Sequence, residues 1–264
     1  MKVIRRDFSK MVIGTVAANG PLALLAKSPL DTPKRTLSFL LIGQSNMAGR
    51  GHFNEVPPIG NNRCKMLRMG RWQPMSEPIN PDRAVFGKDF HSGISLGASF
   101  ADSAAKKFNR EIGLIPCADG GTRLDQWMPG EALFDHAVAM AGFAKRSSEL
   151  GGVLWHQGES DCQLRGDDYF VDLAKMMTEL RRQLGNPNLP IVFGELSEHP
   201  VGPTRKPECF AVFNKKLAAF CAKFPHCALV KAAELPLQSD GIHFSAGSLR
   251  VLGQRYFEAF ETIR

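Results

Sequence analysis

The sequence lacks the patterns that mark several classes of protein. Its six cysteines include no C-x-x-C pair, which argues against a zinc ribbon or a thioredoxin-like site. No run of Lys and Arg is interleaved with aromatic residues, so the composition disfavours nucleic-acid binding. The chain also contains no internal repeat, linker or low-complexity segment. What remains is an ordinary globular composition, with 264 residues, 44% of them hydrophobic and 22% charged, enough for one α/β domain with a sizeable core.

No apolar run is long and uninterrupted enough to predict a membrane span. The most apolar early stretch, "MVIGTVAANGPLALLA", is broken by Asn, Gly and Pro and falls short of about 20 apolar residues. It follows the basic segment "MKVIRRDFSK" and ends in small residues, which is the layout of an export signal. We predict a signal peptide over residues 1–26, cleaved near Ala26. The alternative is a tethered N-terminal helix.

The pair Arg5-Arg6 gives this signal its type. The motif resembles the twin-arginine signal, which sends proteins out of the cytoplasm already folded. Residues 1–26 hold four basic residues and one acidic residue, so they contribute 3 of the 7 net positive charges. The modest remainder gives residues 27–264 no strong attraction to a polyanion. We therefore predict export by the twin-arginine machinery, a periplasmic or secreted mature protein, and no stable membrane span after signal removal.

Cysteine usage leaves the redox state open. In an oxidising compartment, the local candidates for a disulfide are Cys221 with Cys227 and Cys209 with Cys221. Scattered cysteines such as these are also commonly buried free thiols. No metal and no cofactor is predicted.

From residue 36 onward, apolar runs of strand length alternate with amphipathic stretches of helix length. Strands are predicted at 37–42, 112–116, 152–155, 190–194 and 228–231. Helices are predicted at 97–108, 133–148, 169–184, 210–224 and 246–263. This alternation implies an α/β domain over residues 27–264 with a mainly parallel, five-stranded sheet covered by helices on both faces. A Pro- and Gly-rich insertion at about 50–92 is long enough to shape a binding site.

The ends of the predicted strands carry a matching set of polar groups. Ligands of open parallel sheets bind beyond the carboxyl ends of the strands. The first strand leads into "GQSNMAG" with Ser45, the second into "GGTRLDQW" with Gly121, and the third into "WHQGESD" with Gln157. Close to the C-terminus, "DGIHF" supplies Asp240 and His243 three residues apart.

Acyl transfer by a serine needs such an inventory. A serine hydroxyl becomes a good nucleophile only when a neighbouring imidazole takes its proton. A carboxylate on the other imidazole nitrogen fixes the tautomer, and hydrogen-bond donors stabilise the oxyanion of the tetrahedral intermediate by roughly 3–4 kcal/mol each. We predict Ser45 as nucleophile, His243 as base, Asp240 as its partner, and the oxyanion hole as the N–H groups of Ser45 and Gly121 with the Gln157 amide.

Together these motifs resemble the SGNH hydrolases over residues 37 to 262. The match is nearest to the carbohydrate esterase branch, which includes acetylxylan esterase-like (family 6) and sialate O-acetylesterase-like proteins. The resemblance implies a flavodoxin-like, three-layer α/β/α fold and the same catalytic and oxyanion-hole residues, with Gln157 where many SGNH enzymes place Asn. It also implies an O-acetylated carbohydrate as substrate. The alternatives are a lipase or thioesterase on this scaffold and a non-catalytic carbohydrate-binding relative.

Other residues have competing interpretations. "GISLG" places Ser95 in a G-x-S-x-G pattern, the nucleophile elbow of α/β-hydrolases, but a polar segment precedes it where that elbow needs a strand. His156 is expected to be a hydrogen-bonded residue beside Gln157. Glu159 is expected to hold loops together, against Arg123 or a backbone amide. Trp127 is a candidate for stacking on a sugar ring or for packing.

Overall fold

We describe the protein from a computed structural model, in which residues 35–81, 91–198, 200 and 207–264 are described. The predicted export signal and residues 82–90 of the insertion lie outside these ranges. Among the described helices, none combines the length and apolar character that crossing a membrane requires. The described residues belong to one compact unit that begins at residue 34.

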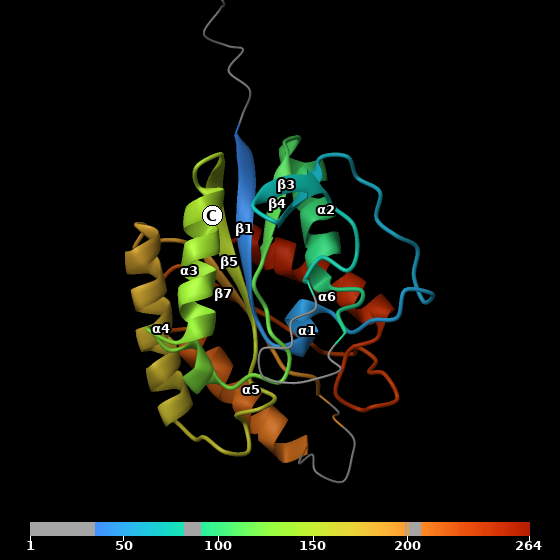
Figure 1. Ribbon diagram of the computed structural model, residues 1–264. Helices are drawn as coiled ribbons and strands as arrows, with labels where there is room; N and C mark the ends of the chain where they lie inside the picture. The colour runs from blue at the N-terminus through green and yellow to red at the C-terminus, as the bar shows by residue number, and fades with distance from the viewer. Residues whose placement is uncertain (1–34, 82–90, 199, 201–206) are drawn as a thin grey trace, which may run out of the picture. The chain divides into compact units, whose positions relative to one another are not determined.

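The centre of the fold is a seven-stranded sheet in the order β3-β2-β4-β1-β5-β6-β7 (Figure 1). Its strands are β1 (Thr36–Gly43), β2 (Cys64–Arg68), β3 (Arg71–Pro74), β4 (Ile112–Pro116), β5 (Ser148–His156), β6 (Ile191–Gly194) and β7 (Cys227–Val230). All neighbouring pairs are parallel except β2 and β3. The five predicted strands are confirmed.

The predicted strand count was wrong by two, because the insertion contributes the hairpin β2–β3 at one edge. Its strands, "CKMLR" and "RWQP", mix charged and apolar residues and show no long apolar run. The turn between them uses Met69 and Gly70, both with positive φ (50° and 73°), which suits a two-residue hairpin. β2 then pairs in parallel with β4, so the insertion extends the main sheet.

Helices cover both faces of the sheet, as predicted (Figure 1). They are α1 (Ser45–Ala48), α2 (Leu96–Phe108), α3 (Ala132–Ala144), α4 (Asp168–Leu184), α5 (Pro207–Cys221) and α6 (Ala246–Glu261). Helices α2 and α6 pack on one face, and α3, α4 and α5 on the other. The helix predicted at 133–148 ends four residues early, because Ser148 starts β5 and its hydroxyl donates to the Ala144 carbonyl at 2.8 Å.

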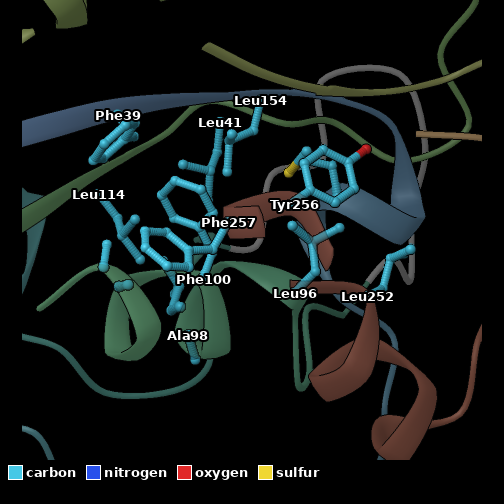
Figure 2. Packing of buried hydrophobic residues seen from close by; sticks show 14 of the residues in the cluster. Phe39, Leu41, Leu96, Ala98, Phe100, Leu114, Leu154, Leu252, Tyr256 and Phe257 are labelled. Atoms are coloured by element: carbon cyan, nitrogen blue, oxygen red, sulfur yellow. The ribbon is translucent and has the colours of Figure 1, made fainter. Parts of the chain in front are cut away.

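Strand β1 is buried on both sides and supplies both halves of the core. Its side chains alternate, with Phe39 and Leu41 facing α2 and α6 and Leu40 and Ile42 facing the other helices. Figure 2 shows the first of these layers, in which Phe39 and Phe100 meet edge to face with ring centroids 4.7 Å apart. This packing fixes β1 and therefore everything attached to its carboxyl end.

β1 is also the strand at which the connections change direction. After β1 the chain forms β2, β3 and β4 on one side of it and later adds β5, β6 and β7 on the other. At such a switch point, the loops after neighbouring strands separate and leave a crevice for a ligand. The short helix α1 begins there, directly after β1 (Figure 1).

Candidate active site

The predicted nucleophile lies in a tight turn at the end of β1. Gly43 has φ +129°, and a Cβ there would lie 2.2 Å from the His156 carbonyl oxygen, so only glycine fits beside β5. Gln44 N–H donates to that same carbonyl at 2.9 Å, and α1 begins at the next residue. Ser45 therefore occupies the first turn of a helix, where backbone N–H groups have no intrahelical acceptor. Its hydroxyl and its N–H are presented at the switch point.

Ser45, His243 and Asp240 form a continuous chain of hydrogen bonds. His243 Nε2 lies 2.8 Å from Ser45 Oγ, and His243 Nδ1 lies 2.6 Å from Asp240 Oδ2. Because the aspartate accepts at Nδ1, that nitrogen carries the proton and Nε2 faces the serine as an acceptor. The structure thus brings Ser45, early in the chain, into contact with His243 and its neighbour Asp240, which lie near the C-terminus.

Asp240 is held by the loop that it belongs to. Its Oδ1 accepts from the backbone N–H groups of Ile242 and His243, both at 3.0 Å, while Oδ2 faces the imidazole. Partial burial raises the pKa of Asp240, but these backbone and imidazole hydrogen bonds outweigh it and leave the pKa below its ordinary value. The aspartate is therefore ionised at neutral pH and orients the imidazole.

The glycine pair after β4 lies beside the nucleophile. A Cβ on Gly120 would lie 3.6 Å from Ser45 Cβ, which is ordinary van der Waals contact, and 2.2 Å from Arg50 Nη2, the movable end of a flexible side chain. Gly121 follows with φ +75°, a conformation that favours glycine. The loop passes beside Ser45 with two glycines in succession, and Gly120 is the one that lies next to the Ser45 side chain.

Gln157, the third predicted donor, is buried and its amide is engaged within the fold. Its Nε2 lies 2.6 Å from Asp161 Oδ2, 3.0 Å from the Thr122 carbonyl and 3.1 Å from Gln44 Oε1. Its Oε1 accepts from the Tyr169 hydroxyl at 2.7 Å. Since an amide nitrogen has two protons, one of them is shared between two of these three acceptors. Donation to an oxyanion requires exchange of that shared bond.

A cavity of about 640 Å³ opens beside the triad. Most of the residues that line it have polar side chains: Arg50, His52, Asn54, His91, Ser92, Gln238, Asp240 and His243, with two glycines. One aromatic residue, Phe53, also lines it and is 54% exposed. A larger cavity of about 750 Å³ lies by the amino ends of the strands, near Leu37 and Phe260, and includes no serine, cysteine or histidine.

The other residues considered from the sequence make contacts within the fold. Ser95 precedes α2 as its N-cap residue, is 1% exposed, and its hydroxyl has no hydrogen-bond partner among the described residues. Trp127 is buried and its indole N–H donates to Thr122 Oγ1 at 3.0 Å, so it packs and does not stack on a ligand. Arg123 pairs with Asp125, and Glu159 instead accepts from Asn46 Nδ2 at 2.7 Å.

His156 is buried against α6, as expected for a structural histidine. A Cβ on Gly194 would lie 2.4 Å from His156 Nδ1 and 2.1 Å from the Tyr256 hydroxyl, so the glycine makes room for both. The hydroxyl donates to the Trp155 carbonyl at 2.8 Å and lies 3.0 Å from Nδ1. Burial lowers the pKa of His156 to about 3, so its imidazole is neutral at physiological pH.

The six cysteines are free thiols. Cys227 Sγ lies 3.5 Å from the Cys221 carbonyl, which places one predicted disulfide pair close together without a bond. Within the described ranges, no three His, Cys, Asp or Glu side chains are grouped as metal ligands.

Comparison with known proteins adds the family. The profile of a family described as carbohydrate esterase, sialic acid-specific acetylesterase, matches residues 35–262. The chain belongs to this carbohydrate esterase family. A probable carbohydrate esterase of Arabidopsis thaliana is 30% identical over 243 residues, which span 84% of this chain and 89% of the relative. Its solved structure gives a TM-score of 0.72 at 25% identity, covering 86% of this chain and 98% of that one.

More distant structures place the esterase in a wider fold group. A carbohydrate acetylesterase of Xanthomonas citri gives a TM-score of 0.64 at 18% identity, covering 86% of this chain and 56% of that one. A lipase/acylhydrolase of Enterococcus faecalis gives 0.51 at 14% identity, covering 87% and 98%. The fold is that of the SGNH hydrolases, and the esterase is a carboxylic ester hydrolase.

Proposed function

We propose that this esterase removes O-acetyl groups from a carbohydrate by a Ser-His-Asp mechanism. The observation that carries the proposal is the hydrogen-bonded chain from Ser45 Oγ through His243 to Asp240, with spacings of 2.8 and 2.6 Å. Such a chain supplies a nucleophile, a base and an orienting carboxylate in the order that acyl transfer requires. A non-catalytic relative has no need to keep these three side chains in contact.

The reaction follows from this geometry in two steps. Ser45 Oγ attacks the acetyl carbonyl carbon while its proton moves to His243 Nε2, and the carbonyl oxygen becomes an oxyanion. The tetrahedral intermediate collapses, the bond to the sugar oxygen breaks, and His243 returns the proton to that oxygen. A water molecule then attacks the acetyl-serine, giving its proton to His243, and acetate leaves as the Ser45 hydroxyl re-forms. Asp240 stabilises the imidazolium in both steps.

Three donors are proposed for the oxyanion. The Ser45 N–H lies in the first turn of α1 and the Gly121 N–H in the loop beside it. The Gln157 amide is the third, by exchanging the proton that it shares between two of its three internal acceptors. Its short bond to Asp161 keeps the amide in place during that exchange. Each donor aimed at the oxyanion is worth about 3–4 kcal/mol in the transition state.

The hydrogen-bonding side chains around the cavity favour a sugar over a lipid. Arg50, Asn54 and Gln238 offer the hydrogen-bonding groups that hydroxyl-rich ligands need, and Phe53 offers one exposed aromatic face. An acyl chain or a lipid would call for a broad apolar groove. Relatives named as a probable carbohydrate esterase and a carbohydrate acetylesterase support the same substrate class.

A substrate panel tests the proposal. The mature protein should release acetate from O-acetylated sugars with higher kcat/KM than from long-chain acyl esters or acyl thioesters. Phe53→Ala should raise KM for the acetylated sugar and leave KM for a small aryl acetate unchanged, because only the sugar reaches the aromatic face. A preference for long acyl chains would assign the lipase or thioesterase alternative, and binding of sugar without acetate release would assign the non-catalytic one.

The location of this activity is part of the proposal. The basic and apolar segments of residues 1–26 and the pair Arg5-Arg6 support export by the twin-arginine machinery to the periplasm or the exterior.

A further inference from the structure

We propose that Asn46 is a positioning residue that, held by Glu159, sets the distance between the His243 imidazole and the Ser45 hydroxyl. This inference rests on the proposed role of Ser45 and His243. It assigns a task to the residue that directly follows the nucleophile in the chain.

Asn46 binds the backbone on both sides of the catalytic histidine. Its Oδ1 accepts from the Phe244 N–H at 3.1 Å, and its Nδ2 donates to the Ile242 carbonyl at 3.3 Å. The side chain is buried, with the residue 1% exposed, so water offers no substitute for either bond. One amide therefore fastens residues 242 and 244 to the residue that follows Ser45.

Glu159 determines which way this amide faces. Its Oε1 accepts from Asn46 Nδ2 at 2.7 Å, and its side chain is only 1% exposed. A carboxylate oxygen accepts hydrogen bonds, so the nitrogen end of Asn46 must face Glu159 and the oxygen end must face the Phe244 N–H. Glu159 follows β5, so the contact joins the loops after β1 and β5 to the C-terminal histidine loop.

The need for this contact follows from the layout of the triad. Asp240 and His243 share one short loop, so their mutual geometry is set locally. The distance from His243 to Ser45 is not, because 198 residues separate them. A second hydrogen bond joins the histidine loop to the segment after α1, farther from the reacting atoms: Gln238 Nε2 donates to the Arg50 carbonyl at 2.6 Å. Asn46 makes the buried hydrogen bonds directly beside the reacting atoms. A displacement of about 1 Å there can lower the rate by 10²-fold.

A matched pair of variants separates positioning from folding. Asn214 is another buried asparagine, and it makes the same two kinds of backbone bond, accepting from Leu196 N–H and donating to the Leu196 carbonyl, both at 2.9 Å. Both variants should lower the unfolding temperature, Asn46→Ala by more than Asn214→Ala, because it also leaves the buried Glu159 without its Asn46 donor. Only Asn46→Ala should lower kcat for an acetyl ester, by about 10²-fold, with KM within about two-fold of the parent protein.

The hydrogen bond between Asn46 and Glu159 supplies a second test, which does not depend on the folding of Asn46→Ala. Glu159→Gln keeps an oxygen that can accept from Asn46 Nδ2 and should retain most of the kcat. Glu159→Leu removes the acceptor and should lower kcat at unchanged KM. In both variants the acid limb of the kcat/KM profile should stay in place, because the contact between Asp240 and His243 lies within one loop.

Two results would overturn the inference. One is a kcat in Asn46→Ala no lower than in Asn214→Ala, and the other is equal kcat in Glu159→Gln and Glu159→Leu. Titration of reactive serines with a fluorophosphonate, run on every variant, corrects each kcat for inactive protein. Ser45→Ala is assayed alongside, since activity in that variant would contradict the proposed function itself, whereas its inactivity with a normal Asn46→Ala would contradict the positioning role alone.

Discussion

The Ser45 hydroxyl and the His243 imidazole lie 2.8 Å apart although 198 residues separate them in the chain. The serine is fixed by β1, which is buried on both faces at the centre of the sheet. The histidine comes from a loop that precedes α6 and carries its own aspartate. The contact therefore depends on how that loop is docked against the end of β1.

The first prediction concerns the choice of nucleophile. Ser45→Ala should remove nearly all activity on an acetyl ester, because Ser45 Oγ is the hydroxyl that the imidazole contacts. Ser95→Ala should keep most of it, since Ser95 is buried at the start of α2. Initial rates with a soluble aryl acetate decide between them. The reverse pattern would assign the nucleophile to the G-x-S-x-G serine.

The second prediction concerns the division of work between His243 and Asp240. His243→Ala should be close to inactive, because the triad contains no other group to accept the Ser45 proton. Asp240→Asn should be impaired but less so, since the loop still presents the imidazole. The pKa of Asp240 lies below its ordinary value, so this carboxylate stays ionised at and below neutral pH and continues to orient the imidazole. The acid limb of the kcat/KM profile should therefore fit the uptake of a single proton. Full activity in His243→Ala would rule the triad out.

The third prediction concerns Gln157. Its replacement by Ala should lower kcat by roughly 10²–10³-fold without a matching rise in KM, since an oxyanion donor acts only in the transition state. Steady-state kinetics give the two constants separately. Because the substitution also removes several internal hydrogen bonds, the unfolding temperature is measured on the same preparation. An effect on KM alone would move Gln157 from the oxyanion hole to the pocket wall.

The fourth prediction concerns stability against acid. Burial lowers the pKa of His156 to about 3, against an ordinary value near 6.5, so the unfolded chain binds a proton there more readily than the folded one. This contribution is intact above about pH 6.5 and is lost as the pH falls from there toward 3, at up to about 1.4 kcal/mol per pH unit.

A variant isolates the His156 contribution from that of the carboxyl groups. His156→Gln keeps an N–H donor for Tyr256 and has no titrating ring, so its urea midpoint should fall less steeply between pH 7 and 5 than that of the parent protein. Identical slopes in the two proteins would mean that His156 does not control this part of the acid sensitivity.

The fifth prediction concerns export. Replacing Arg5 and Arg6 together by Lys should leave the precursor in the cytoplasm, because the twin-arginine machinery reads that pair. Cell fractionation with an antibody to the mature domain measures the distribution. Unchanged export, or absence of the parent protein from every compartment outside the cytoplasm, would contradict the signal assignment.

The sequence by itself determined the class of fold and the positions of the chemistry. Apolar runs and helical spacing locate elements that are buried on one or both faces, because burial follows from local periodicity. Five strands and the main helices were predicted for this reason. The strand-end motifs then gave Ser45, Asp240 and His243, which the structure places in contact. The edge hairpin β2–β3 was missed because its strands mix charged and apolar residues. They show neither a long apolar run nor a regular alternation of apolar and polar residues.

Only the tertiary structure decided which polar groups meet. Glu159 accepts a hydrogen bond from Asn46 and does not pair with Arg123. The Gln157 amide donates to three internal acceptors. Gly120 is the glycine beside Ser45. The partners in these contacts come from loops after different strands. No local pattern encodes such pairings, because the distance between two loops depends on the strand order and on how closely the strands pack at the switch point.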